Sequence, residues 1–149
     1  MDYVSYIRGM VGHKKIIMNA AAVIIVNNGA ILLQRRSDNG QWGLIGGILE
    51  LDETYREAAV REAAEETGLL VRLEYLVGIY HGYQVRWASG DCAHVICAVF
   101  KAGVTGEPRC DAESIELRYF MPDQLPEIHA EDHRRAIQDY LSGVRDRVD

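Results

Sequence analysis

The sequence predicts a single α/β domain in which helices pack on a mixed β-sheet. Three observations lead to this prediction: β-branched and aromatic segments outnumber helical ones, one strong helical segment lies mid-chain, and an amphipathic one follows near the end. The 149 residues suit one hydrophobic core of ordinary size. No repeat, low-complexity tract or Pro/Gly-rich linker interrupts them. We therefore expect one domain over residues 1–149, beginning with a leader segment over residues 1–15.

The first elements expected are two strands joined by a tight turn. Residues 19–26 and 30–36 are largely apolar, and the pair Asn28-Gly29 supplies the positive φ angles that a hairpin turn needs. Residues 39–53 are glycine-rich with an apolar middle, and we expect them to form a loop.

A helix is expected over residues 54–67, which are rich in strong helix formers. Thr54 and Glu57 have the spacing of a capping box at its start, and Gly68 is placed to end it. Both termini are therefore marked in the sequence.

The second half of the chain reads as three strands and a final helix. Residues 70–83 predict a strand that is long or interrupted near Gly78, and residues 94–102 predict a central strand. Residues 114–120 alternate apolar and polar side chains, as a half-buried strand does. Residues 131–143 predict an amphipathic C-terminal helix.

Net charge and cysteine content limit the classes of binding partner and the cellular compartment that we expect. The formal charge of −6 gives no general attraction for a nucleic-acid backbone. Cys92, Cys97 and Cys110 show neither CxxC nor zinc-site spacing, which favours free thiols in a reducing cytoplasm. The longest apolar stretch, residues 16–26, is too short to span a bilayer, and the first residues carry no signal-peptide run.

Glu62, Glu65 and Glu66 form an acidic cluster at the end of the predicted helix. Like charges three or four residues apart repel each other, and the negative end of the helix dipole disfavours them further. Arg61 is the nearest cation. A solvated helix face is the common explanation, but such faces usually interleave Lys or Arg. A bound divalent cation such as Mg²⁺ or Mn²⁺ would remove the repulsion and indicates phosphoryl chemistry.

The residues around this cluster have a specific spacing. Gly47 is followed after five residues by Glu53, and after seven more by the run over residues 61–69, REAAEETGL. This pattern resembles the signature of the Nudix hydrolase (MutT-like) family at every fixed position. We call residues 47–69, which carry it, the box. A weaker resemblance extends over residues 16–126. The resemblance implies an α/β/α sandwich with a mixed β-sheet and a catalytic loop–helix–loop, and it assigns no subclass.

The resemblance also implies a metal site. Glu65 and Glu66 would be the principal ligands, with Glu62 as a further ligand or as an acid/base group. The backbone carbonyl of Gly46 would be another ligand. The expected cofactor is Mg²⁺, with Mn²⁺ as a substitute, and the implied mechanism is attack of water on phosphorus.

Other box residues would support this site. Arg61 would orient the glutamates, and Glu53 would support the metal site or its waters. Gly47 would let the backbone approach the metal and phosphates. The general base comes either from the box or from a later loop, where Glu113 is favoured over Glu116 because Glu116 lies inside a predicted strand.

Two residues depart from the pattern of many family members. Ile45 stands where many have proline, which makes the loop less rigid. Asp52 stands where many have glycine, and Asp tolerates turn geometry better than most other residues do. The metal ligands themselves are retained.

The candidates for substrate binding are Arg35, Arg36, Trp42 and Tyr83, with Tyr80 and Trp87 as further aromatic side chains after the box. One arginine is expected to face solvent if the strand alternation continues. Trp42 either stacks on a base, shields the site or packs under its loop. His129 and His133 have helical metal-ligand spacing, but surface polarity at a helix start explains residues 129–133 better.

The implied reaction is hydrolysis of a pyrophosphate bond in a nucleoside diphosphate linked to another moiety. A nucleoside triphosphate, ADP-ribose and a nucleotide sugar all stay open as substrates. The alternative is a Nudix-fold protein that senses a nucleotide without cleaving it. The expected partner is a small nucleotide molecule rather than a nucleic acid or a membrane, and a homodimer is left open.

Overall fold

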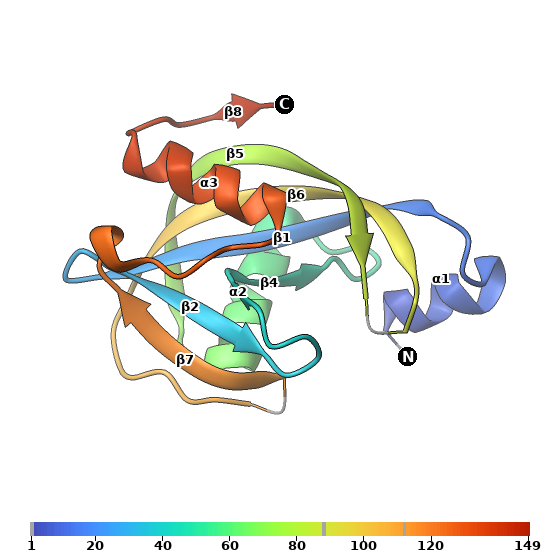
Figure 1. Cartoon of the computed structure of the whole chain (residues 1–149), viewed down its shortest axis with the longest axis horizontal. Coiled ribbons are helices and arrows are strands. Elements are labelled where there is room, and N and C mark those ends of the chain that lie inside the picture. Colours follow the sequence, from blue (N-terminus) through green and yellow to red (C-terminus); the bar gives the residue numbers. More distant parts are fainter. Residues whose placement is uncertain (1, 88, 112) are drawn as a thin grey trace.

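A mixed eight-stranded β-sheet forms the middle layer of the computed structural model, which describes residues 2–87, 89–111 and 113–149. Its main path runs β3-β2-β1-β6-β5-β8, while β4 pairs with β1 and β7 with β2 (Figure 1). The elements are α1 (Tyr3–Val11), β1 (Ile16–Asn27), β2 (Ala30–Arg36), β3 (Trp42–Gly43), β4 (Ile45–Ile48), α2 (Tyr55–Thr67), β5 (Val71–Arg86), β6 (Cys92–Val104), β7 (Ser114–Phe120), a 3₁₀ turn η1 (Pro122–Gln124), α3 (Glu131–Leu141) and β8 (Arg147–Val148).

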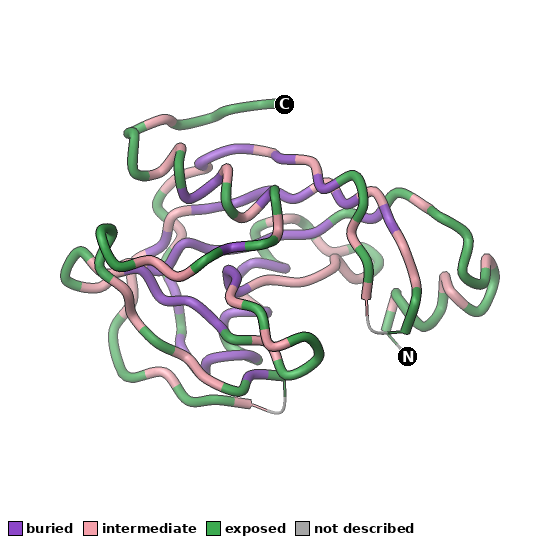
Figure 2. Tube along the Cα trace, viewed as in Figure 1, coloured by how far each residue is buried: buried purple, intermediate pink, exposed green. Residues whose placement is uncertain are grey.

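Helices α2 and α3 cover opposite faces of this sheet. Ala58, Ala59 and Ala63 of α2 pack into one apolar cluster, whereas Ala136 and Ile137 of α3 pack into another. Strand β1 contributes to both clusters, and Figure 2 shows the buried residues concentrated along the sheet between the helices. The predicted α/β/α arrangement with a mixed sheet is confirmed. None of the described helices is long and apolar enough to cross a membrane.

The predicted hairpin is formed by β1 and β2. Asn27 pairs with Ala30, and Asn28 and Gly29 between them have φ angles of 50° and 79°. These are the positive angles that the Asn-Gly pair supplies most readily. On its other side β1 pairs in parallel with β6, which makes β6 the central strand that the sequence predicts.

The glycine-rich segment expected to be a loop is partly strand. Residues of β3 pair with β2, and β4 pairs antiparallel with β1, with Gly46 opposite Ala22. A Cβ atom on Gly46 would lie 2.4 Å from the backbone oxygen of Ala21. Because Gly46 has no side chain, this segment can approach β1 closely enough to join the sheet, which brings it beneath α2.

Helix α2 has the termini that the sequence predicts. The Thr54 side chain accepts a hydrogen bond from the Glu57 N–H, and the Glu57 carboxylate accepts one from the Thr54 N–H. Gly68 ends the helix in the left-handed conformation, with φ 72°. Asp52 also has a positive φ of 63°, as expected for a residue that replaces glycine in a turn.

The two ends of the chain differ in detail from the prediction. Part of the leader forms helix α1, whereas no helix is predicted over residues 1–15. Helix α3 ends at Leu141, two residues before the predicted boundary at 143. Strand β5 continues past Gly78 with register shifts on β6, one of them between Leu76 and Gly78, so it is both long and irregular.

Candidate active site

One cavity of about 840 Å³ brings most of the predicted site residues together. Its walls come from the β2–β3 loop, β4, α2, the ends of β5 and β6, the segment before β7 and the start of α3. Among the residues that line it are Arg36, Trp42, Gly46, Gly47, Arg61, Glu62, Glu65, Glu66, Tyr83 and Glu113. Segments far apart in the sequence therefore converge on the acidic end of α2.

Glu66 is the most buried of the acidic residues at this end of α2. Its side chain accepts a hydrogen bond from the backbone N–H of Gly46 at 3.2 Å, and the residue is 2% exposed. Burial, followed by the negative charges of Glu62 and Glu113, raises the pKa of Glu66 to about 9. A carboxylate in this position needs a positive partner to stay ionised at neutral pH.

Glu62 lies directly against Gly47. A Cβ atom on Gly47 would be 2.3 Å from Glu62 Oε1, so only glycine leaves room for this carboxylate. This contact supplies a different reason for the glycine from the one expected, which was approach to metal and phosphate. Burial raises the pKa of Glu62, and the Arg61 hydrogen bond opposes that rise.

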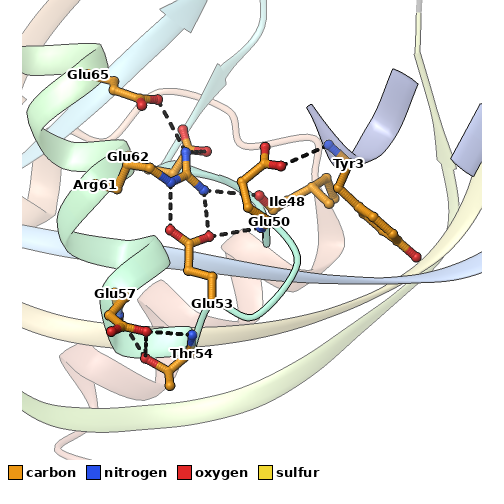
Figure 3. A network of polar contacts seen from close by, with 9 residues as sticks. All are labelled: Tyr3, Ile48, Glu50, Glu53, Thr54, Glu57, Arg61, Glu62 and Glu65. Atoms are coloured by element: carbon orange, nitrogen blue, oxygen red, sulfur yellow. Dashed lines mark hydrogen bonds and ion pairs between the residues drawn. The ribbon is translucent and has the colours of Figure 1, made fainter. Parts of the chain in front are cut away.

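Arg61 holds the acidic residues in a hydrogen-bonded network (Figure 3). Its Nε and Nη2 atoms donate to the two carboxylate oxygens of Glu53 at 2.6 and 2.8 Å. Its Nη1 donates to Glu62 Oε1 at 2.7 Å and to Glu65 Oε2 at 3.2 Å. Glu53 Oε2 also accepts the Glu50 N–H. The repulsion within the sequence cluster is thus partly compensated by one guanidinium with a fixed geometry.

The donor set at this end of the cavity fits a hard divalent cation. Glu62, Glu65 and Glu66 supply oxygen donors only, and the Glu65 side chain is 59% exposed. Glu66 is a nearly buried carboxylate whose hydrogen bond to Gly46 leaves most of its lone pairs unused. The charges are not balanced by Arg61 and Arg36 alone, so added positive charge would stabilise the cluster.

Glu113 and Glu116 are separated by the fold. Glu113 lines the cavity, and its backbone carbonyl accepts hydrogen bonds from Ser37 N at 2.9 Å and Ser37 Oγ at 3.0 Å. Its N–H donates to Asp111 Oδ1 at 3.0 Å. Glu116 lies on β7, where it forms an ion pair with Arg118. Of the two candidates for the base, only Glu113 faces the site.

The two arginines on β2 also take different positions. Arg36 lines the cavity and is held there by Asp38, with two hydrogen bonds of 3.0 and 2.9 Å. The Asp38 hydrogen bond raises the pKa of the Arg36 guanidinium. Arg35 is exposed, and its Nε donates to the Gly40 carbonyl instead. The expectation that one arginine faces solvent is met by Arg35, which the structure does not bring to the cavity.

Three aromatic side chains line the cavity, namely Trp42, Tyr83 and Trp87. Trp42 also packs edge-on against Phe120, with ring centroids 5.0 Å apart, so it combines a packing contact with a place in the wall. Tyr80 is fully buried and donates its hydroxyl hydrogen bond to Asp139, away from the site. It belongs to the core rather than to the substrate candidates.

The expectation of surface polarity at residues 129–133 is wrong for two of them. Asp132 is 4% exposed and His133 is half-buried, and both line the cavity. His129 and Glu131 are exposed, and the His129 side chain is 48% accessible. One signal in the sequence points to this burial: Asp132 precedes the buried Ala136 by four residues, so both lie on the inner face of α3.

The same region contains a compact group of polar side chains. Ligand atoms of Cys97, Asp132 and His133 all lie within 4.8 Å of one another. Within the described ranges no other set of three such residues meets this distance, the box glutamates included. The acidic end of α2 and the start of α3 thus form two distinct polar regions of one cavity.

Comparisons with known proteins agree with the box and the fold. Residues 17–140 match the NUDIX domain family. The chain is 33% identical over 132 residues to a MutT-like protein of Streptomyces ambofaciens, which covers 88% of this chain and 80% of that protein. It is 39% identical over 115 residues to an ADP-ribose pyrophosphatase of Methanocaldococcus jannaschii, covering 74% of this chain and 65% of that relative.

Solved structures lead to the same family. The crystal structure of a MutT NUDIX hydrolase from Burkholderia pseudomallei has a TM-score of 0.71 and 29% identity, covering 83% of this chain and 97% of that one. The family match spans most of the sequence and includes the whole of β4 and α2. The chain therefore belongs to the NUDIX family and is a Nudix hydrolase, an enzyme that cleaves pyrophosphate bonds.

Proposed function

We propose that the cavity is an active site for nucleoside diphosphate derivatives, in which water attacks phosphorus and the pyrophosphate bond is cleaved. The observation that carries the proposal is the convergence of Glu62 and Glu66, both nearly buried, with Glu113 in one cavity. Carboxylates with raised pKa values in a cleft are typical of functional sites. We propose that residues 1–149 act as one domain, with the chemistry located on α2.

Nudix hydrolases generally depend on a divalent metal ion, and we propose Mg²⁺ here, with Mn²⁺ as a substitute. Glu62, Glu65, Glu66 and the backbone carbonyl of Gly46 would hold it. When bound, such an ion neutralises phosphate charge and lowers the pKa of a coordinated water. All of these donors are oxygen atoms, the ligand type that Mg²⁺ prefers.

The protein's own side chains would orient the reactants. Glu113 would accept a proton from the attacking water. Its backbone is held by hydrogen bonds with Ser37 and Asp111, and its side chain lines the cavity without an ion-pair partner among the described residues. Arg36 would bind a phosphate oxygen, a role for which its charge and its place in the wall suit it. Arg61 would keep Glu62 and Glu65 in position.

The substrate side would be formed by the aromatic residues Trp42, Tyr83 and Trp87. The relative from Methanocaldococcus jannaschii is an ADP-ribose pyrophosphatase, which makes ADP-ribose one member of the first panel to be assayed.

The proposed location is a reducing cytoplasm. It is supported by Cys92, Cys97 and Cys110, which are all free thiols.

The test is hydrolysis of a panel of nucleoside triphosphates, ADP-ribose and nucleotide sugars, with Mg²⁺ and with a chelator. We expect metal-dependent release of phosphate, pyrophosphate or a nucleoside monophosphate, and a loss of at least about 100-fold in Glu66→Gln. Glu127→Gln is the matched control, since the Glu127 side chain is 81% exposed and lies outside the cavity. Tight nucleotide binding without turnover across the panel would indicate nucleotide sensing instead.

A further inference from the structure

Helix α1 connects two walls of the cavity that are far apart in the sequence. It precedes residues 17–140, which match the NUDIX family, so the family signature assigns it no role. Its N-cap residue Asp2 and its second residue Val4 line the cavity. Figure 1 shows the helix beside the ends of β5 and β6. The helix is therefore placed to influence the site without belonging to the box.

The C-terminal half of α1 is attached to the start of β6. The Arg8 side chain is 11% exposed, and its Nη2 donates a hydrogen bond to the Cys92 carbonyl at 3.0 Å. Just after the helix, His13 Nδ1 lies 2.6 Å from Asp91 Oδ1. Ile7 is partly buried and packs against the apolar cluster beneath α3. These contacts hold the helix against the sheet.

The first residue of α1 contacts the box. The backbone N–H of Tyr3 donates a hydrogen bond to Glu50 Oε2 at 2.8 Å, although the two residues are 47 positions apart. The first N–H groups of a helix have no partner within the helix, and the helix dipole favours a negative charge beside them. Figure 3 shows the Tyr3 ring directed away from the network. The contact therefore depends on the backbone of Tyr3 rather than on its side chain.

Glu50 connects this helix to Arg61 through Glu53. The Glu50 N–H donates to Glu53 Oε2 at 2.9 Å, and the Glu53 N–H donates to the Glu50 carbonyl at 3.2 Å. The Glu53 carboxylate also accepts two hydrogen bonds from Arg61, of 2.6 and 2.8 Å. Arg61 in turn donates to Glu62 and Glu65. A continuous series of hydrogen bonds thus runs from α1 to the acidic cluster (Figure 3).

The turn between Glu50 and Glu53 has little buried surface of its own. Leu51 is 64% exposed, and Asp52 is exposed with a positive φ of 63°. That backbone conformation costs an aspartate more free energy than a glycine. A segment with few buried contacts opens locally at a low free-energy cost. An anchor at Glu50 is therefore expected to restrict this turn.

We propose that α1 is a positioning element of the active site and that Glu50 is the positioning residue through which it acts. The hydrogen bond from Tyr3 holds the turn over residues 50–53, and Glu53 then holds Arg61 against the proposed metal ligands. This inference rests on the proposed function, because it takes the box glutamates as metal ligands. It adds a helix outside the box that determines how well the metal site is preformed.

The substitution Tyr3→Pro removes this one donor and is expected to keep the helix. Proline has no N–H and is well tolerated at the first position of a helix. Asp2 has φ −73° and ψ 161°, the extended conformation that suits a residue before proline. Tyr3→Ala is the matched control, because it loses the same ring but keeps the N–H. The difference between the two variants therefore reports on the hydrogen bond.

The measurement is Mg²⁺ binding without substrate, followed as the rise of the thermal midpoint with Mg²⁺ concentration. We expect the apparent Kd for Mg²⁺ to be about three- to tenfold weaker in Tyr3→Pro than in Tyr3→Ala. Amide hydrogen exchange over residues 50–53 of the metal-free protein is expected to be faster in Tyr3→Pro. A role in folding alone would lower the midpoint of the metal-free protein and leave the Kd for Mg²⁺ unchanged.

Variants of Glu50 give a second arm. Glu50→Ala is expected to weaken Mg²⁺ binding at least as much as Tyr3→Pro does, whereas Glu50→Gln keeps an acceptor oxygen and is expected to retain most of the binding. Because both changes break one contact, Tyr3→Pro should add little in the Glu50→Ala background. If Tyr3→Pro does not fold, the ranking of Glu50→Ala and Glu50→Gln still tests the contact.

Two results would overturn the inference: equal Mg²⁺ dissociation constants for Tyr3→Pro and Tyr3→Ala, or an undiminished effect of Tyr3→Pro in the Glu50→Ala background. Mg²⁺ binding in the expected order, without hydrolysis of any diphosphate derivative, would instead contradict the proposed function alone.

Discussion

Glu66, 2% exposed, accepts a hydrogen bond of 3.2 Å from the backbone N–H of Gly46. Helix α2 and strand β4 therefore meet where a carboxylate is held against a backbone segment without side chains, because Gly46 and Gly47 leave no Cβ atoms in the way. This contact joins β4, which pairs with β1, to the acidic cluster at the end of α2. Changes to the Glu66 carboxylate are therefore expected to affect catalysis more than the pairing of β4, whereas a side chain at Gly46 would also disturb the sheet.

Gly47→Ala should displace Glu62. The new Cβ atom would lie 2.3 Å from Glu62 Oε1, which would push the carboxylate away from its hydrogen bond with Arg61. We expect turnover to fall by about 10- to 100-fold in steady-state assays. Gly9→Ala is the control, since a Cβ atom at Gly9 on α1 meets nothing within 4 Å. Unchanged turnover in Gly47→Ala would show that the close contact does not matter for the reaction.

Glu113→Gln should slow the chemical step, whereas Glu116→Gln should not. Glu113 lines the cavity, and Glu116 is paired with Arg118 on β7. Loss of a general base typically costs about 10²- to 10⁴-fold in rate, and we expect that loss in kcat with little change in substrate binding. Single-turnover measurements separate the two quantities. The opposite ranking of the two variants would assign the base to Glu116.

Mg²⁺ should stabilise the folded protein through the acidic cluster. A ligand that binds only the folded state adds about 2.7 kcal/mol to the free energy of unfolding at 100 times its Kd. We expect Mg²⁺ to raise the thermal midpoint of the wild type and to raise that of Glu66→Gln much less. Glu127→Gln, with its side chain exposed, should respond like the wild type. Equal shifts in all three proteins would place the ion elsewhere.

Tyr80 should make stability depend on pH in the alkaline range. Burial, and then its hydrogen bond to Asp139, raise the pKa of the Tyr80 phenol above its ordinary value near 10. The neutral phenol is favoured in the folded state, so its contribution is complete below about pH 10. It is lost as the pH rises toward the folded-state value, by up to about 1.4 kcal/mol per pH unit.

Tyr80→Phe should remove that alkaline dependence and lower the free energy of unfolding at neutral pH by about 1 kcal/mol, the usual net value of one hydrogen bond. Tyr6→Phe is the matched control, because Tyr6 is 46% exposed. Denaturant unfolding at pH 7, 9 and 11 measures both effects. Parallel pH profiles for the wild type and Tyr80→Phe would contradict this account of the buried phenol.

Local chemistry made several elements predictable from the sequence. The turn at Asn28 and Gly29 and the caps of α2 at Thr54 and Gly68 depend on neighbouring residues, whose geometry varies little between proteins. The spacing of the box on α2 likewise follows from the helical repeat, which places its glutamates within one or two turns. For these features the order of residues was sufficient.

Other features depend on contacts between residues far apart in the chain. Strand β4 forms because Gly46 can approach Ala21, and no periodicity within residues 39–53 encodes that approach. Arg35 and Arg36 are adjacent residues of the same type, so the sequence does not distinguish them. The pairing of β2 with its neighbours decides which of the two lines the cavity.

Asp132 shows the same limit at the other end of the cavity. A polar residue at a helix start is normally solvated, and its burial follows from the docking of α3 against β5 and β6. Hydrophobic packing of Ala136 and Ile137 orients that helix, and the orientation carries Asp132 and His133 inward. The signature that indicates the reaction type lies in one local segment. The polar side chains at the start of α3 join the cavity wall only after the sheet and its helices have assembled.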